Sequence, residues 1–133
     1  MKRVLFVCTE NANRSQMAEA FARLHGDGVV DPSSAGSSPS GHVNPRAVVA
    51  MRERGYDLTS HRSKSTADVG AEPWDVLITM GCGDSCPSLP ARAREDWQLA
   101  DPRAMPPEAF NVVRDDIEQR VLDLIARLRD SSL

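Results

Sequence analysis

The chain has no apolar run long enough to cross a bilayer, few aromatic residues, three cysteines and no excess of positive charge. Its formal net charge of -3 offers no diffuse basic field for nucleic acid or a membrane, so any affinity for anions must be local. Three cysteines do not make an even disulfide framework, which favours redox or catalytic use. We therefore expect a cytoplasmic, monomeric protein that contacts neither nucleic acid nor membrane.

The 133 residues suit one compact domain, residues 1–133, with a single core. Short apolar runs predict strands, and apolar residues three or four apart predict helices. The predicted strands lie at 3–7, from 29 onward, at 76–79 and at 97–99, and the predicted helices lie at 15–25, from 44 to about 55, and at 107–128. Strands that alternate with helices predict an α/β fold, here a four-stranded parallel sheet with helices on both faces.

The first predicted strand runs directly into a short polar segment that begins at Cys8 and reaches Arg14. The backbone N–H groups of a tight loop, together with the start of the following helix, can converge on one tetrahedral oxyanion. Arg14 adds a planar fork of donors for two oxygens of phosphate or arsenate. The same positive field favours the thiolate form of Cys8, a candidate nucleophile. The candidate substrate-binding residues are Thr9, Glu10, Asn11, Ala12, Asn13, Arg14 and Ser15.

A cysteine and an arginine at this spacing often arise by chance, with the cysteine buried and the arginine in a surface ion pair. The order of strand, polar loop and helix favours the catalytic interpretation. In open parallel sheets the ligand lies beyond the carboxyl ends of the strands, which brings Cys8 together with the loop of Cys82 and Cys86 and with Asp101. Asp101 precedes a proline, so by itself it would be interpreted as a solvated turn residue.

Further motifs extend over essentially the whole chain. They are Gln16-Met17-Ala18-Glu19, Ser34-Ala35-Gly36, Asn44-Pro45, Asp57-Leu58, His61-Arg62-Ser63 and Asp96-Trp97-Gln98-Leu99-Ala100-Asp101-Pro102. With these motifs the chain resembles the low-molecular-weight phosphatase superfamily and, within it, the arsenate reductases of that fold. The resemblance implies that Cys8 attacks the oxyanion, that Arg14 holds it and that Asp101 donates a proton to the departing oxygen. It also implies that Ser15 hydrogen-bonds Cys8 and that Asn11 braces the loop.

Two features favour arsenate over phosphate esters. Tyrosine phosphatases of the superfamily have aromatic residues just after the Asp-Pro pair, where this chain has Arg103-Ala104-Met105. Reduction of arsenate needs two electrons, and a second thiol, Cys82 or Cys86, could attack the Cys8 adduct, expel arsenite and leave a disulfide. The resemblance thus implies thiol-dependent arsenate reduction without a bound cofactor, with thioredoxin, glutaredoxin or a low-molecular-weight thiol as external reductant.

Other functions stay open at this point. One is a phosphatase that hydrolyses phosphotyrosine or small phosphate esters, and another is a non-enzymatic oxyanion or redox sensor. A zinc site at Cys82 and Cys86 would need two further ligands, and their loop contains no histidine. Met80 stands where thioredoxin-linked relatives have a cysteine, which leaves the reductant and the order of disulfide exchange open. Lys64 replaces an aspartate of the potassium site in those relatives, so we expect no bound metal ion.

Overall fold

The computed structural model describes residues 1–70, 72–81 and 89–130, and its sheet contains four parallel strands in the order β2-β1-β3-β4. The strands are β1 (Lys2–Cys8), β2 (Val30–Gly36), β3 (Trp74–Thr79) and β4 (Ala91–Asp96). The α-helices are α1 (Arg14–His25), α2 (Pro45–Arg52) and α3 (Pro107–Asp130), and the short 3-10 helices are η1 (Leu58–Ser60), η2 (Thr66–Val69) and η4 (Pro102–Ala104). The predicted four-stranded parallel sheet is confirmed.

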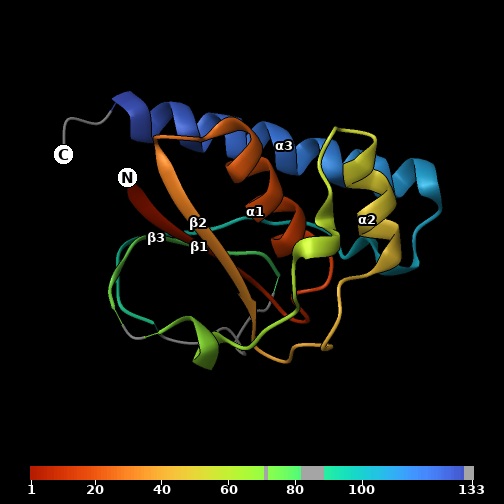
Figure 1. Ribbon diagram of the computed structural model, residues 1–133, viewed down its shortest axis with the longest axis horizontal. Helices are drawn as coiled ribbons and strands as arrows, with labels where there is room; N and C mark the ends of the chain where they lie inside the picture. The colour runs from red at the N-terminus through yellow and green to blue at the C-terminus, as the bar shows by residue number, and fades with distance from the viewer. Residues whose placement is uncertain (71, 82–88, 131–133) are drawn as a thin grey trace.

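The α-helices α1 and α3 lie on one face of the sheet, and α2 packs against both of them in the same core cluster (Figure 1). Val4 and Phe6 of β1 point to that face and pack in one core cluster with α1 and α3. Leu5 and Val7 point to the other face and belong to a second core cluster, against which Val69 of η2 packs. Helical elements therefore flank both faces. On the second face, the helical element among the described residues is the 3-10 helix η2.

The boundaries of the helices follow from local chemistry. Asn44 caps α2, because its side chain accepts a hydrogen bond from the backbone N–H of Arg46 and Pro45 occupies the first turn. Along α3, residues three or four apart form a buried stripe, as predicted: Val113, Ile117, Val121 and Leu124. None of the helices in the described ranges is long and apolar enough to cross a membrane.

The fourth strand lies at Ala91–Asp96, so the predicted strand at 97–99 is wrong. β4 is an edge strand that pairs with β3 alone, and its side chains are exposed or half-buried. Backbone pairing holds it in the sheet, so its sequence carries no apolar alternation that would reveal it. Trp97 follows the strand and packs in the core against Phe6, with ring centroids 5.8 Å apart.

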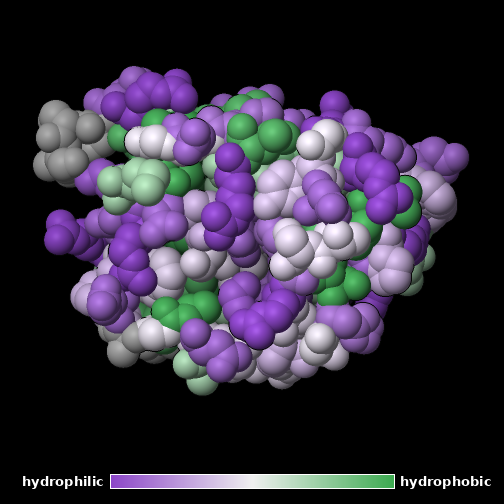
Figure 2. All heavy atoms as spheres, viewed as in Figure 1, coloured by the Kyte–Doolittle hydropathy of each residue, from purple (hydrophilic) through white to green (hydrophobic). Residues whose placement is uncertain are grey.

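The side of the molecule seen in Figure 1 is mainly hydrophilic at its surface (Figure 2). Apolar patches there are interrupted by charged and polar side chains. The large apolar side chains that are exposed among the described residues are scattered: Met1, Leu24, Val49, Val112 and Leu122. Single exposed apolar residues of this kind are ordinary on a protein surface.

Candidate active site

A small cavity lies beyond the carboxyl ends of β1 and β4. It is lined by Cys8, Glu10, Ala12, Asn13, Arg14 and Asp101. Its volume of about 10 Å³ is close to what one water molecule needs. A strand followed by a tight turn into α1 places the sulfur of Cys8 and the start of the helix at one point, so backbone N–H groups and the helix terminus favour an anion there.

Ser15 connects the sulfur of Cys8 to the rest of the loop. Its Oγ lies 2.8 Å from Cys8 Sγ, and Asn11 Nδ2 donates a hydrogen bond of 2.8 Å to the same oxygen. Because Ser15 Oγ accepts from Asn11, its single hydrogen is available for the sulfur. The hydroxyl can therefore donate to Cys8, an arrangement that would suit a thiolate.

Asn11 fixes the shape of the loop. It has a φ of 52°, in the left-handed region that asparagine tolerates better than most residues. Its Oδ1 accepts hydrogen bonds from Gln16 Nε2 at 2.9 Å and from the backbone N–H of Lys64 at 2.9 Å. The side chain is fully buried, so these bonds hold the strained residue in place.

His61 and Tyr56 extend this hydrogen-bond chain away from the cavity. His61 Nδ1 lies 2.9 Å from Gln16 Oε1, and His61 Nε2 lies 2.7 Å from the hydroxyl of Tyr56. Gln16 Oε1 can only accept, so Nδ1 carries a proton. Burial lowers the pKa of His61 and raises the pKa of Tyr56, so Tyr56 donates to an unprotonated Nε2. From Tyr56 to Ser15, each side chain thus donates to the next one toward Cys8, and Gln16 Nε2 also donates to the carbonyl oxygen of Arg62 at 2.8 Å.

Arg14 is buried beside the cavity, and its guanidinium faces the segments that follow β3 and β4. Its Nη1 donates to the carbonyl oxygen of Leu99 at 3.3 Å, and its Nη2 lies 3.8 Å from Asp101 Oδ2. Gly81 has a φ of 90° and leaves the space that this guanidinium occupies, because an added β-carbon would collide with Nη1. The predicted residues Cys8, Arg14 and Asp101 therefore meet at one cavity.

Residues 3–132 match the family described as low molecular weight phosphotyrosine protein phosphatase. The chain belongs to this family. It is 40% identical to the glutaredoxin arsenate reductase of Synechocystis sp., over 96% of this chain and 99% of that relative.

Solved structures of arsenate reductases share the fold. One, an arsenate reductase in the phosphate binding state, is similar to this chain with a TM-score of 0.86 and 39% identity, over 96% of this chain and 99% of that one. A thioredoxin-dependent arsenate reductase from Corynebacterium glutamicum has a TM-score of 0.79 and 29% identity, over 97% of this chain and 62% of that one.

Asp101 of this phosphatase-family chain lies on a more exposed segment than the loop does. Its side chain is 44% exposed, and its Oδ1 accepts from the backbone N–H of Arg103 at 3.0 Å, which caps η4. Arg46 of α2 donates to the carbonyl oxygens of Arg103, at 2.9 Å, and of Met105. The segment is thus tied to α2 by a side chain that sequence reasoning did not single out.

The other predicted site residues divide into two groups. Glu10, Ala12 and Asn13 line the cavity, whereas Thr9 does not, and the side chain of Asn11 points into the hydrogen-bond chain. Asn13 Oδ1 is buried and has no partner among the described residues, so it is free to contact a ligand. The predicted second thiols, Cys82 and Cys86, lie outside the described residues.

Sequence reasoning quoted Gly36 within a motif but gave it no role. A β-carbon at Gly36 would lie 2.7 Å from the carbonyl oxygen of Thr9 and 3.0 Å from the backbone nitrogen of Asn11. Both contacts are with backbone atoms of the loop, which cannot move without changing its shape. Only glycine therefore lets β2 pass this close to the loop, and the Ser34-Ala35-Gly36 motif was the signal available in the sequence.

Glu19 of α1 has a buried carboxylate that lies close to Lys64. It accepts a hydrogen bond of 2.6 Å from Ser34 Oγ, and Arg23 Nε lies 2.9 Å from its Oε2. The ammonium of Lys64 lies 3.8 Å from Oε1, and burial lowers the pKa of that lysine. Two side-chain cations therefore face this carboxylate.

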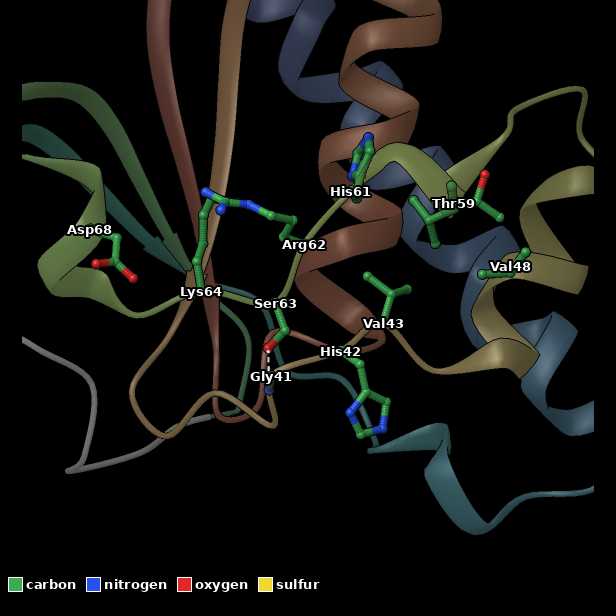
Figure 3. A pocket seen from close by; sticks show the side chains of 11 residues that line it. Gly41, His42, Val43, Val48, Thr59, His61, Arg62, Ser63, Lys64 and Asp68 are labelled. Atoms are coloured by element: carbon green, nitrogen blue, oxygen red, sulfur yellow. Dashed lines mark hydrogen bonds between the residues drawn. The ribbon is translucent and has the colours of Figure 1, made fainter.

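A larger cavity, of about 790 Å³, lies beside the segment 61–64, and the described residues that line it include no cysteine (Figure 3). Ser63 lies between it and the loop, since its Oγ accepts from the backbone N–H of Gly41 at 3.2 Å and donates to the carbonyl oxygen of Glu10 at 2.8 Å. The smaller cavity is the candidate active site, because it contains the nucleophile and both charged partners.

Proposed function

We propose that this protein is a thiol-dependent arsenate reductase in which Cys8 attacks an arsenate held by the loop 8–15. The observation that carries this proposal is the single small cavity bordered by the sulfur of Cys8, the guanidinium of Arg14 and the carboxylate of Asp101. A cavity bordered by a sulfur nucleophile and a guanidinium suits a small tetrahedral oxyanion. The likeness to arsenate reductases over nearly the whole chain selects arsenate among such anions.

In the first step a bond forms between the Cys8 sulfur and arsenic, and one arsenic–oxygen bond breaks. Arg14 and the loop N–H groups neutralise the negative charge of the oxyanion. Asp101 supplies the proton with which the oxygen leaves as water, a contribution of roughly a hundredfold to ten-thousandfold in general acid catalysis. Ser15 holds the sulfur in position for the attack, because its Oγ lies 2.8 Å from Cys8 Sγ.

In the second step a second thiolate attacks the sulfur of Cys8. A sulfur–sulfur bond forms, the sulfur–arsenic bond breaks, and its electron pair stays on arsenic, which leaves as arsenite. Cys82 or Cys86 supplies this thiolate inside the chain, or an external thiol supplies it directly. The thiols are oxidised by two electrons, and arsenic is reduced by two.

An external thiol then reduces the disulfide by exchange. The reductant is a thioredoxin, a glutaredoxin or a low-molecular-weight thiol, since the relatives include one named for glutaredoxin and one for thioredoxin. The enzyme acts as a monomer in the cytoplasm, where such thiols are kept reduced.

Arsenite production in the presence of added thiol tests this proposal. The wild-type protein should produce arsenite only when a thiol reductant is present, and Cys8→Ser should produce none. The double variant Cys82→Ser/Cys86→Ser should produce no arsenite with thioredoxin if a thiol of this chain resolves the adduct. It should still produce arsenite if an external thiol resolves the adduct. Rapid hydrolysis of an aryl phosphate without any arsenite would support a phosphatase instead, and anion binding without turnover under every reductant would support a sensor.

A further inference from the structure

An ion pair joins the anion-binding loop to the segment that carries Asp101. Arg103 Nη1 lies 2.6 Å from Glu10 Oε2, although the two residues are 93 positions apart in the chain. Glu10 lines the small cavity, so the ion pair stands at the mouth of that cavity. Neither residue belongs to the set of Cys8, Arg14 and Asp101 that performs the first chemical step.

The backbone of the segment sets the direction of Arg103. Asp101 Oδ1 accepts from the N–H of Arg103, and Arg46 donates to its carbonyl oxygen. These two hydrogen bonds fix the backbone on both sides of Arg103. Its side chain therefore extends toward Glu10 from a fixed position. The ion pair and the carboxyl group of Asp101 are thereby kept on the same side of the cavity.

The departing oxygen must lie next to Asp101, because that carboxyl group protonates it. In a free oxyanion this oxygen bears nothing but hydrogen. In a phosphate ester the same oxygen carries the organic group. That group would have to extend out of the cavity between Asp101 and the Glu10–Arg103 ion pair.

The charges of the ion pair also suit an anion site. The carboxylate of Glu10 borders an anion site and would repel an oxyanion if it stood alone. The guanidinium of Arg103 neutralises it, so the loop can present an acidic residue at the mouth without loss of anion affinity.

Resting on the proposed function, we infer that the Glu10–Arg103 ion pair determines specificity, because it closes the mouth of the cavity to aryl esters and admits the free oxyanion. The pair is exposed, with the Arg103 side chain 61% and the Glu10 side chain 35% accessible. Exposed ion pairs contribute little to stability, so its loss should change selectivity and leave folding intact.

The chain offers a matched control pair. Arg127 of α3 lies 2.8 Å from Glu95 of β4, and its side chain is 57% exposed. The variant Arg127→Ala removes the same kind of interaction at a place that does not line the cavity. Comparison of Arg103→Ala with Arg127→Ala therefore separates selectivity at the mouth from a general effect of losing a surface arginine.

Protection of Cys8 from iodoacetamide, followed by mass spectrometry of its peptide, measures entry into the cavity without turnover. Inorganic phosphate should protect Cys8 in the wild type and in both variants. Phenylphosphonate should protect it poorly in the wild type and in Arg127→Ala. In Arg103→Ala the half-protecting concentration of phenylphosphonate, relative to that of phosphate, should fall about tenfold.

A charge swap provides the rescue. In the double variant Glu10→Arg/Arg103→Glu the ion pair is restored with reversed polarity, and discrimination against phenylphosphonate should return. An unchanged ratio in Arg103→Ala, or a swap variant that stays permissive, would overturn the role in specificity while leaving arsenate reduction untouched. Failure of phosphate to protect Cys8 in the wild type would overturn the proposed function and this inference together.

Discussion

The loop 8–15 and the segment 101–105 border the same cavity but are held in opposite ways. In the loop, Asn11 and Ser15 are fully buried and hydrogen-bonded to one another. In the segment, the side chain of Asp101 is 44% exposed, and the segment is held by the exposed Glu10–Arg103 ion pair and by the hydrogen bonds from Arg46 to the carbonyl oxygens of Arg103 and Met105. The difference separates two tasks: the buried loop fixes the nucleophile and the anion, and the exposed segment supplies the proton.

Gly36→Ala should have the largest effect, because it deforms the buried loop. The added β-carbon meets backbone atoms of Thr9 and Asn11 at 2.7 and 3.0 Å, so the loop N–H groups shift away from the anion. We expect arsenite production to fall about a thousandfold, as when oxyanion donors are lost. The free energy of unfolding should fall by about 1–3 kcal/mol, measured by urea denaturation.

Gly28→Ala is the matched control for this change. Gly28 has a φ of 82° and no atom near its missing β-carbon, so alanine there strains the backbone without touching the loop. Stability should fall by about 1 kcal/mol while arsenite production stays at the wild-type rate. Wild-type activity in Gly36→Ala would contradict the tight approach of β2 to the loop.

Asp101→Asn should impair chemistry and leave folding alone. Asparagine can still cap η4, but it supplies no acidic proton to the departing oxygen. We expect single-turnover arsenite release to slow about a hundredfold, with the free energy of unfolding unchanged within about 0.5 kcal/mol. A loss of stability comparable to that of Gly36→Ala would show that the two regions do not differ as described.

Arg46→Ala should loosen the exposed segment and produce a smaller loss. The change removes the hydrogen bonds to the carbonyl oxygens of Arg103 and Met105 and the stacking of the guanidinium over Phe110. Because Asp101 itself remains, we expect arsenite production to fall by less than about tenfold. Steady-state kinetics should show the loss mainly in kcat, and a change confined to KM would contradict a role in orienting the acid.

His61 gives the smallest effect, a pH dependence of stability that belongs to the buried region. Burial lowers its pKa below the ordinary 6.5, so near that pH the unfolded chain binds the proton more readily than the native protein. Stability should therefore rise with pH up to about 6.5 and be lost progressively as the pH falls below it. His61→Gln should flatten this part of a urea-midpoint profile, and an unchanged slope would contradict the assignment.

Local patterns in the sequence predicted much of this arrangement. The apolar run of β1, the stripe of α3 and the Asn-Pro start of α2 are signals that neighbouring residues carry by themselves. The loop is contiguous, so Cys8 and Arg14 could be recognised together. β4 was missed because an edge strand held by backbone pairing shows no apolar alternation.

Contacts between distant residues could not be predicted in the same way. The bond from His61 to Gln16 joins residues 45 positions apart, and the bonds from Arg46 reach 57 and 59 positions along the chain. Nothing in the residue types at these positions specifies their partners. Such pairs exist only because the sheet order β2-β1-β3-β4 brings the loops of separate strands together.

The most direct test of the central claim is a single turnover with one equivalent of arsenate, followed by thiol blocking and mass spectrometry of the cysteine peptides. The account predicts that arsenite appears together with a disulfide, which joins Cys8 to Cys82, Cys86 or the external thiol or, after exchange, joins Cys82 to Cys86. Arsenite release with all three cysteines recovered as free thiols, and no disulfide with the external thiol, would contradict it.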